Sequence, residues 1–140
     1  MLVWKAQWAN IVACPGQKSS KDNLACAQSL FERGDESVWR SSVSRSYYAA
    51  YCAAASKICV PGQAFRHGWN NPPHEDLPNM LSHATGLNGA AKRAACRGLR
   101  ILREARIDAD YRPGRTIDKR DAYVALKEAI RVLHHLELLQ

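Results

Sequence analysis

A row of basic side chains on one expected helix is the feature of this sequence that could do chemistry. Arg93, Arg97 and Arg100 are spaced i, i+4 and i+7, which puts them on one helix face. Arg103 and Arg106 continue this face with a slight rotation. Such a row is typical of a surface that binds the phosphates of RNA or of a nucleotide. A solvated helix face with no ligand shows the same pattern and is the more frequent case.

The distribution of charge favours the phosphate-binding alternative. The chain carries a net charge of +7, and residues 88–115 hold eight basic and three acidic side chains, a balance of +5. Most of the excess charge therefore lies in the segment that contains the arginine row, as a phosphate-bearing partner would favour. We expect RNA or a nucleotide to be bound by the side chains of Arg97, Arg100, Arg103 and Arg106.

The end of this row has further polar groups. Asp110 stands four residues after Arg106, a spacing that suits either a helix-surface ion pair or a joint contact with a ligand. Tyr111 follows directly and can hydrogen-bond a phosphate, but a phenol with a pKa near 10 is a poor base at neutral pH. Its hydroxyl could instead bond to the backbone at the end of the bundle.

Two more aromatic residues are candidates for a binding site. Tyr47 and Tyr48 point about 100° apart on a helix, so one belongs to the core and the other can reach a surface or a second subunit. We take Tyr48 as the binding candidate. Trp69 lies in a loop rich in proline, where it could stack on a base or only fix the loop.

The elements that position these residues are expected to be helices. Residues 44–55 form an Ala- and Tyr-rich stretch with apolar side chains at helical spacing. Helices are expected over about 20–33, from 35 or 37 to 59, over 74–83 and 90–109, and from 116 or 118 onward. The first is expected to be capped by Ser19 or Ser20 and ended by Gly34. No segment shows strand alternation. The sequence thus predicts an all-α, antiparallel four- to five-helix up-down bundle over 19–140, after a lead-in segment of 1–18.

The expected core contains the residues that share the apolar stripes: Tyr47, Tyr51, Leu99, Leu102, Leu126 and Leu133. The five cysteines include no CxxC pair, and the five histidines show no ligand spacing, so neither a metal nor a cofactor is expected. All five cysteines are expected to be reduced thiols of a cytoplasmic protein. No apolar run approaches the roughly 20 residues that span a bilayer, so no membrane partner is expected.

Two motifs in this order carry a resemblance to a known family. The first is SRSYYAAYCAAA at 44–55, and the second is RIDADY at 106–111, with an HxxLPxML segment between them at 74–81. This pattern resembles the HEPN superfamily of small helical prokaryotic proteins, in the branch with a helix-borne YYAA and a later RxxADY. The resemblance covers about residues 20–138.

The resemblance implies a helical bundle that forms a homodimer. Many relatives are ribonucleases or toxins, often with a small nucleotidyltransferase antitoxin, and others bind nucleotides or RNA without cutting. The cutting members use an Arg followed after four to six residues by a His, where Arg stabilises charge on the phosphate and His moves the proton. Here Arg106 is followed after four residues by Tyr111 instead of His.

Two functions follow from these observations. The first is a toxin–antitoxin or defence-type module that binds RNA, a nucleotide or a partner protein, without strong catalysis. The second is a metal-independent ribonuclease that uses Arg106 with Tyr111 or His74. The missing histidine favours the first.

Overall fold

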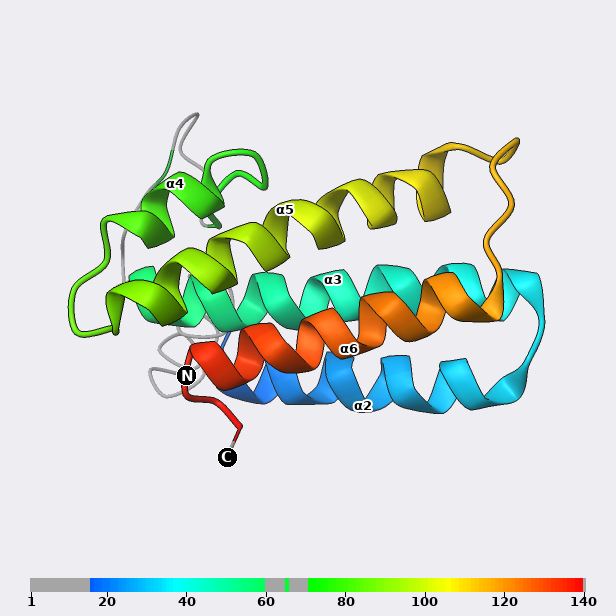
Figure 1. Ribbon diagram of the computed structural model, residues 1–140, viewed down its shortest axis with the longest axis horizontal. Coiled ribbons are helices and arrows are strands. Elements are labelled where there is room, and N and C mark those ends of the chain that lie inside the picture. The colour runs from blue at the N-terminus through cyan, green and yellow to red at the C-terminus, as the bar shows by residue number, and fades with distance from the viewer. Residues whose placement is uncertain (1–15, 60–64, 66–70, 140) are drawn as a thin grey trace, which may run out of the picture.

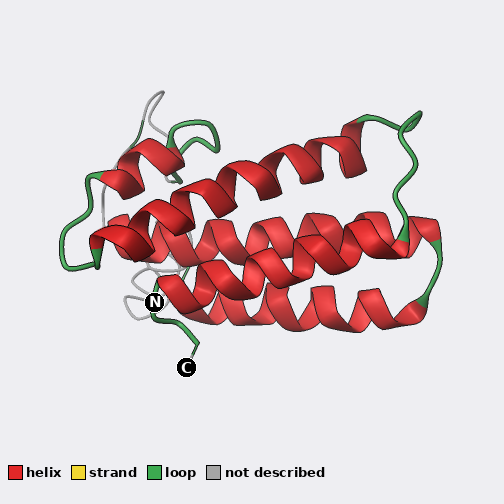
Figure 2. Ribbon diagram, viewed as in Figure 1, coloured by secondary structure: helices red, strands yellow, loops and turns green. Residues whose placement is uncertain are grey.

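The computed structural model describes residues 16–59, 65 and 71–139, and its described part is all helical (Figure 2). The helices are α2 (Gln17–Arg33), α3 (Glu36–Ile58), α4 (Leu77–Ser82), α5 (Gly89–Tyr111) and α6 (Lys119–His135). The four long helices run up and down the molecule, so that neighbours in the chain are antiparallel, and short α4 covers one end of α5 (Figure 1). The predicted all-α up-down bundle is therefore confirmed.

Helix α3 is the centre of the bundle and contacts α2, α4, α5 and α6. Its second half is built from alanines that are fully buried, such as Ala50 and Ala54. Small side chains let neighbouring helices approach closely, and the Tyr47 and Tyr51 rings fill the space between them. All the predicted core residues are buried: Tyr47, Tyr51, Leu99, Leu102, Leu126 and Leu133.

The start of the first helix differs from the prediction. Helix α2 begins at Gln17 with Gly16 as its N-cap, so neither Ser19 nor Ser20 caps it. Ser20 is instead buried inside the helix, where its hydroxyl donates to the Ala49 carbonyl oxygen at 2.8 Å. A serine near a helix start is a cap only when its side chain faces the helix end, and here it faces α3.

The predicted ends of the next elements are confirmed in two places and wrong in one. Gly34 ends α2 in the left-handed conformation, and Asp35 caps α3 by accepting from the Val38 N–H. Helix α4 is shorter than the predicted 74–83, because the chain first makes a turn in which the Pro73 carbonyl accepts from Leu77. His74 consequently lies outside the helix.

Helices α5 and α6 meet at a glycine. A Cβ atom built on Gly98 would lie 2.5 Å from Cγ2 of Val132 and 2.9 Å from an Oε of Glu128. Such distances leave no room for a side chain, so Gly98 sets how closely α6 approaches α5.

The expectation that all five cysteines are reduced is wrong, because Cys59 is disulfide-bonded. Cys26, Cys52 and Cys96 are free thiols. The spacing along one helix excludes a bond between Cys52 and Cys59, but it carries no information on contacts between distant parts of the chain. Burial raises the pKa of Cys52 to about 11, so this thiol stays protonated at neutral pH.

Candidate functional site

Arg106 is the centre of a polar and aromatic cluster between α3 and α5. Its side chain is 15% exposed, and its Nε donates to Oδ2 of Asp110 at 3.0 Å. Its Nη2 donates to the hydroxyl oxygens of Tyr48 at 2.9 Å and of Tyr111 at 3.1 Å. We call Tyr47, Tyr48, Tyr51, His74, Arg106, Asp110 and Tyr111 the tyrosine–arginine cluster.

The guanidinium group also lies against aromatic faces. Its central carbon is 5.3 Å from the centroid of Tyr48 and 5.0 Å from that of Tyr111. Burial alone would lower the pKa of Arg106, but the phenols of Tyr48 and Tyr111 and the carboxylate of Asp110 raise it overall. Arg106 is therefore a fixed positive charge that neither gains nor loses a proton in a reaction.

Asp110 holds this charge in place from two sides. Its Oδ2 accepts from Arg106 and also from the Ser44 hydroxyl at 3.0 Å, which connects the end of α5 to α3. Both arginine Nη2 protons go to phenol oxygens, so the hydroxyl protons of Tyr48 and Tyr111 can point to a ligand. Tyr111 is 64% exposed, which makes its hydroxyl the accessible one of the two.

His74 lies beside the cluster and is tied to the tyrosines of α3. Its Nδ1 is 2.6 Å from the Tyr47 hydroxyl, and its ring stacks on Tyr51 with centroids 4.5 Å apart. Burial lowers the pKa of His74, and the nearby charges of Arg106 and Arg103 lower it further, so the ring is neutral at pH 7.

The protonation of this pair decides what His74 can do. Burial raises the pKa of Tyr47 far above its ordinary value, so the phenol keeps its proton. Among the described residues, Nδ1 of His74 is the one acceptor within reach of that proton. The lone pair of Nδ1 is thus occupied, and the neutral ring carries its own proton on Nε2. In this state His74 has no free basic nitrogen.

Tyr51 fixes the loop that carries His74. Its hydroxyl donates to the Pro72 carbonyl oxygen at 2.7 Å. Burial raises the pKa of Tyr51, so this bond keeps its proton at neutral pH. The YYAAY run of α3 therefore serves both the core and the site, since Tyr47 and Tyr51 orient His74 while Tyr48 contacts Arg106.

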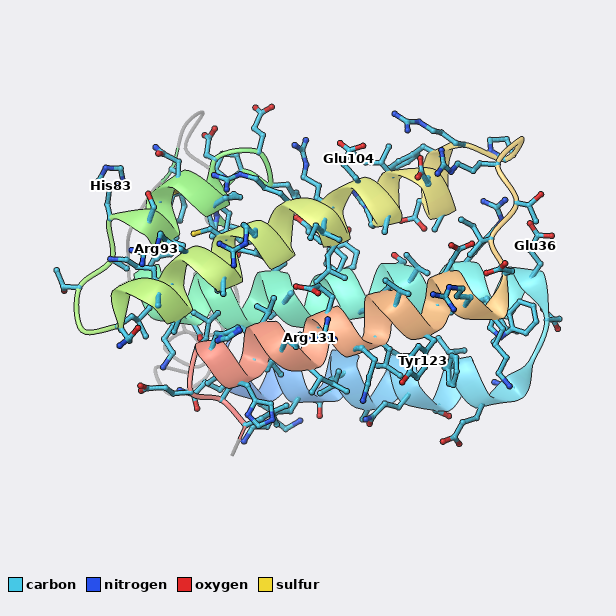
Figure 3. The ribbon with its side chains drawn as sticks, in the orientation of Figure 1. Glu36, His83, Arg93, Glu104, Tyr123 and Arg131 are labelled. Atoms are coloured by element: carbon cyan, nitrogen blue, oxygen red, sulfur yellow. The ribbon has the colours of Figure 1, made fainter. Side chains whose placement is uncertain are left out.

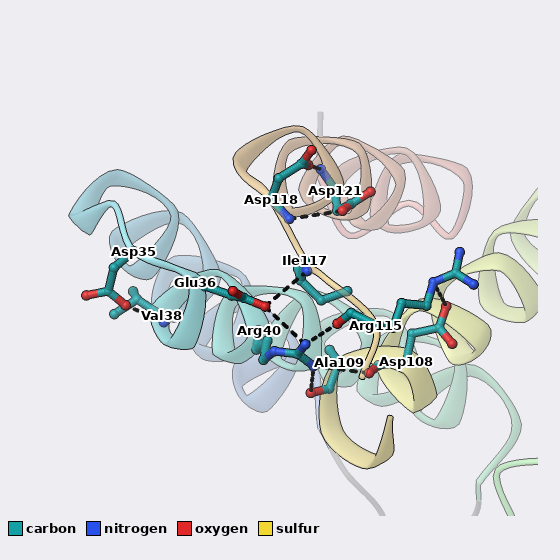
Figure 4. Close-up of polar contacts among 10 residues, drawn as sticks. All are labelled: Asp35, Glu36, Val38, Arg40, Asp108, Ala109, Arg115, Ile117, Asp118 and Asp121. Carbon is teal, nitrogen blue, oxygen red and sulfur yellow. Dashed lines mark hydrogen bonds and ion pairs between the residues drawn. The ribbon is translucent and has the colours of Figure 1, made fainter. Parts of the chain in front are cut away.

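Arg40 supports the end of α5 from which the cluster projects (Figure 4). Its Nη1 donates to the carbonyl oxygens of Asp108, at 3.3 Å, and Ala109, at 3.0 Å, near the end of the helix. Its Nη2 donates to Oε1 of Glu36 at 3.1 Å and to the Arg115 carbonyl oxygen. A half-buried arginine thereby holds together α3, the last turn of α5 and the loop that leads to α6.

The structure divides the predicted basic row into two groups. Arg103 is half-buried, and its charge lowers the pKa values of Tyr47 and His74, while Arg106 lies in the tyrosine–arginine cluster. Arg97 and Arg100 are exposed and line a cavity nearer the start of α5. Trp69 lies outside the described residues.

Several residues of the site have no signal in the sequence. Ser44 and Arg40 are ordinary helix residues, and their roles arise from contacts with residues 66 to 75 positions away. The predicted candidates Arg106, Asp110, Tyr111, Tyr48 and His74 do come together around one region.

In the part of the chain that the structure describes, no group of three or more His, Cys, Asp or Glu side chains could hold a metal ion. Within the same residues, no helix is long and apolar enough to cross a membrane.

The fold and the site define a class: an antiparallel helical bundle whose central helix carries YYAA and whose penultimate long helix ends in RxxADY. The model of the HEPN domain matches residues 18–139 of this chain, so the chain belongs to the HEPN family. HEPN domains are associated with ribonuclease and toxin–antitoxin functions. Comparisons with curated proteins and with solved structures find no match.

Proposed function

We propose that this chain is an RNA-binding HEPN module that holds a phosphate at the tyrosine–arginine cluster without cutting RNA efficiently. One observation carries the proposal. Arg106 donates to the phenol oxygens of Tyr48 and Tyr111, which leaves both hydroxyl protons for a ligand, while His74, the imidazole beside them among the described residues, is hydrogen-bonded to Tyr47. The cluster thus has the parts that bind an anion, and its described residues include no free base.

The binding half of this proposal rests on charge. Asp110 neutralises Arg106 in part, but no carboxylate of the described residues pairs with Arg103. The two arginines stand three positions apart on α5, so their heads are neighbours on one face. The exposed ring of Tyr111 adds a surface on which a base can stack.

The catalytic half rests on the absence of a usable base in the part of the cluster that the structure describes. Metal-free cleavage of RNA needs a group that removes the proton from the 2′-hydroxyl. Tyr111 stands where the cutting relatives have His, and its hydroxyl oxygen already accepts from Arg106. His74 is neutral, but its Nδ1 already accepts from Tyr47. Neither group can take the proton without breaking a hydrogen bond of the cluster.

A ribonuclease is the alternative function. Arg106 donates directly to Tyr111, and its guanidinium carbon lies 5.9 Å from the ring centroid of Tyr47, whose hydroxyl is hydrogen-bonded to His74. Rotation of Tyr47 away from His74 would release Nδ1 as a base. The cut would then depend on Arg106 and His74 together.

We also propose that the module acts as a homodimer, in a toxin–antitoxin or defence-type pair with a nucleotidyltransferase-type partner. Family membership supports this, as do apolar side chains that stay exposed on α5 and α6: Ile101 at 53%, Tyr123 at 49% and Val124 at 48%. Of the four tryptophans, Trp39 packs against the core, and the other three lie outside the described residues. Light scattering that gives a mass near 15.6 kDa would contradict the dimer.

RNA binding is tested by titrating labelled single-stranded RNA at several salt concentrations. We expect affinity to fall steeply with salt, and Arg103→Ala to weaken binding and lower the salt slope by about one unit. Arg33→Ala, which replaces an exposed arginine in the last turn of α2, is the matched control and should leave both unchanged. Absence of binding at low salt, or equal effects of the two variants, would contradict the proposal.

A further inference from the structure

A second basic site lies where α4 packs on the first half of α5. A cavity of about 510 Å³ opens there, and seven residues line it: Ser82, Gly89, Lys92, Arg93, Cys96, Arg97 and Arg100. Figure 3 places Arg93 at this end of the bundle and Glu36 at the opposite end. None of the lining residues belongs to the tyrosine–arginine cluster.

The cavity concentrates positive charge without a compensating carboxylate. Four of its lining residues are Lys or Arg, and none is Asp or Glu. No ion pair within the described residues involves Arg93, Arg97 or Arg100. Like charges this close repel one another, so an empty cavity is electrostatically unfavourable and a bound anion relieves it.

Several contacts fix the position of these charges. The Lys92 Nζ donates to the Ala84 carbonyl oxygen at 2.8 Å, which holds its ammonium group beside the α4–α5 loop. A Cβ atom on Gly89 would lie 3.4 Å from Nη1 of Arg93, so this guanidinium folds over the first turn of α5. The buried Cys96 thiol donates to the Pro78 carbonyl oxygen at 3.2 Å and forms part of the cavity wall.

The Cys96 thiol lies near two of these cations, Arg100 and Lys92. Burial raises the pKa of Cys96, and the charges of Arg100 and Lys92 oppose that rise. Both side chains line the same cavity as this thiol and come from different turns of α5.

The size and charge select a class of ligand. Small-molecule sites have volumes of about 300–1,000 Å³, and this cavity of about 510 Å³ exceeds what phosphate alone would fill. A phosphate monoester carries a charge of about −1.5 to −2 at neutral pH, compared with about −1 for a diester within an RNA strand. Four cations without acids match the monoester better.

We propose that the α4–α5 cavity binds a nucleotide phosphomonoester, either the phosphorylated end of an RNA strand or a free mononucleotide. The first source rests on the proposed RNA-binding function. Arg100 and Arg106 are six residues apart on α5, a rise of about 9 Å. A strand with its terminal phosphate in the cavity would place its next phosphates beside Arg103 and Arg106.

The test compares ligands that differ only in the terminal phosphate. Internally labelled RNA oligomers of one sequence carry a phosphate at the 5′ end, at the 3′ end or at neither end, and AMP and adenosine serve as competitors. The variant is Arg97→Ala with Arg100→Ala. Its matched control is Arg33→Ala with Arg131→Ala, which removes the same charge from exposed positions outside the cavity.

We expect one phosphorylated oligomer to bind at least about tenfold more tightly than the unphosphorylated one, and AMP but not adenosine to compete. This preference should vanish in the cavity variant and persist in the control. If no oligomer binds but AMP does, the site takes a free nucleotide, and the RNA-binding function alone is overturned.

Equal binding of all oligomers without competition by AMP would overturn the cavity proposal and leave RNA binding intact. Circular dichroism checks that both double variants fold. The comparison of ligands on the unaltered chain needs no variant, so a misfolded variant does not affect the result.

Discussion

Replacing Asp110 by Asn separates the binding role of Arg106 from its structural role. The substitution keeps the shape of the side chain and removes the charge that faces Arg106 at 3.0 Å. The amide oxygen can still accept from Ser44, and Nη2 of Arg106 keeps its bonds to Tyr48 and Tyr111. Arg106 should therefore stay in place with its positive charge unopposed.

The expected change in stability is small because two effects oppose each other. An i, i+4 ion pair with side chains 15% and 27% exposed stabilises by about 0.5–1 kcal/mol. A carboxylate in the last turn of a helix costs about 0.3–1 kcal/mol through the helix dipole. The free energy of unfolding should thus change by less than about 1 kcal/mol.

RNA affinity should rise by a larger factor. A phosphate held by Arg106 would lie about 6 Å from the Asp110 carboxylate, and with an effective dielectric constant of about 40–80 their repulsion is about 0.7–1.4 kcal/mol. Its removal corresponds to binding that is about three- to tenfold tighter at low salt, with a smaller gain at high salt.

Fluorescence polarisation with labelled RNA and urea unfolding measure the two quantities. Asp22→Asn is the control, since Asp22 also forms an i, i+4 pair, with Lys18 at 3.0 Å, on exposed α2. The control should leave RNA affinity nearly unchanged. Weaker binding by Asp110→Asn, or a loss of stability clearly above about 1 kcal/mol, would refute the reasoning.

Three further predictions concern the support of the site. Gly98→Ala should lower the free energy of unfolding by about 1–3 kcal/mol through overpacking against Val132, whereas Gly114→Ala, with open space around it, should be nearly neutral in urea unfolding. Arg40→Ala should destabilise by about 1–3 kcal/mol, because it removes the donors to carbonyl oxygens at the end of α5, and should also weaken RNA binding; unchanged binding would show that the cluster does not depend on this support. Burial and the α5 arginines hold the pKa of His74 below its ordinary value of 6.5. The contribution of His74 to stability should therefore be constant above that pH and decrease as the pH falls below it, where the unfolded chain binds a proton that the folded chain does not. His74→Gln should reduce this decrease in the free energy of unfolding between pH 7.5 and 5.5.

The helices and their buried faces could be predicted because they depend on local spacing. Alanine-rich runs, apolar stripes and the Gly34 stop are signals within a few residues, and the structure confirms the bundle and its core. The exact start of α2 could not, because the Ser20 side chain faces α3 rather than the end of the helix, and residue type does not reveal that orientation.

Only those residues of the site that belong to a sequence motif could be predicted from the sequence. The RxxADY and YYAA motifs identify Arg106, Tyr111 and Tyr48, and the structure places both tyrosine hydroxyls within hydrogen-bond distance of Arg106. The bond between Tyr47 and His74 joins residues 27 positions apart across a proline-rich loop, and no local pattern specifies it. The placement of the Lys92 charge likewise depends on a tertiary contact, with the Ala84 carbonyl oxygen.

The claim that this module binds RNA without cutting it efficiently is tested most directly by one time course. End-labelled RNA is held with saturating protein in EDTA at neutral pH, its bound fraction is measured by polarisation, and its length is followed on a denaturing gel. We predict that the RNA stays bound and intact for hours, and that Arg106→Ala reduces the bound fraction. Rapid cleavage that Arg106→Ala or His74→Ala abolishes would contradict the claim and establish the ribonuclease instead.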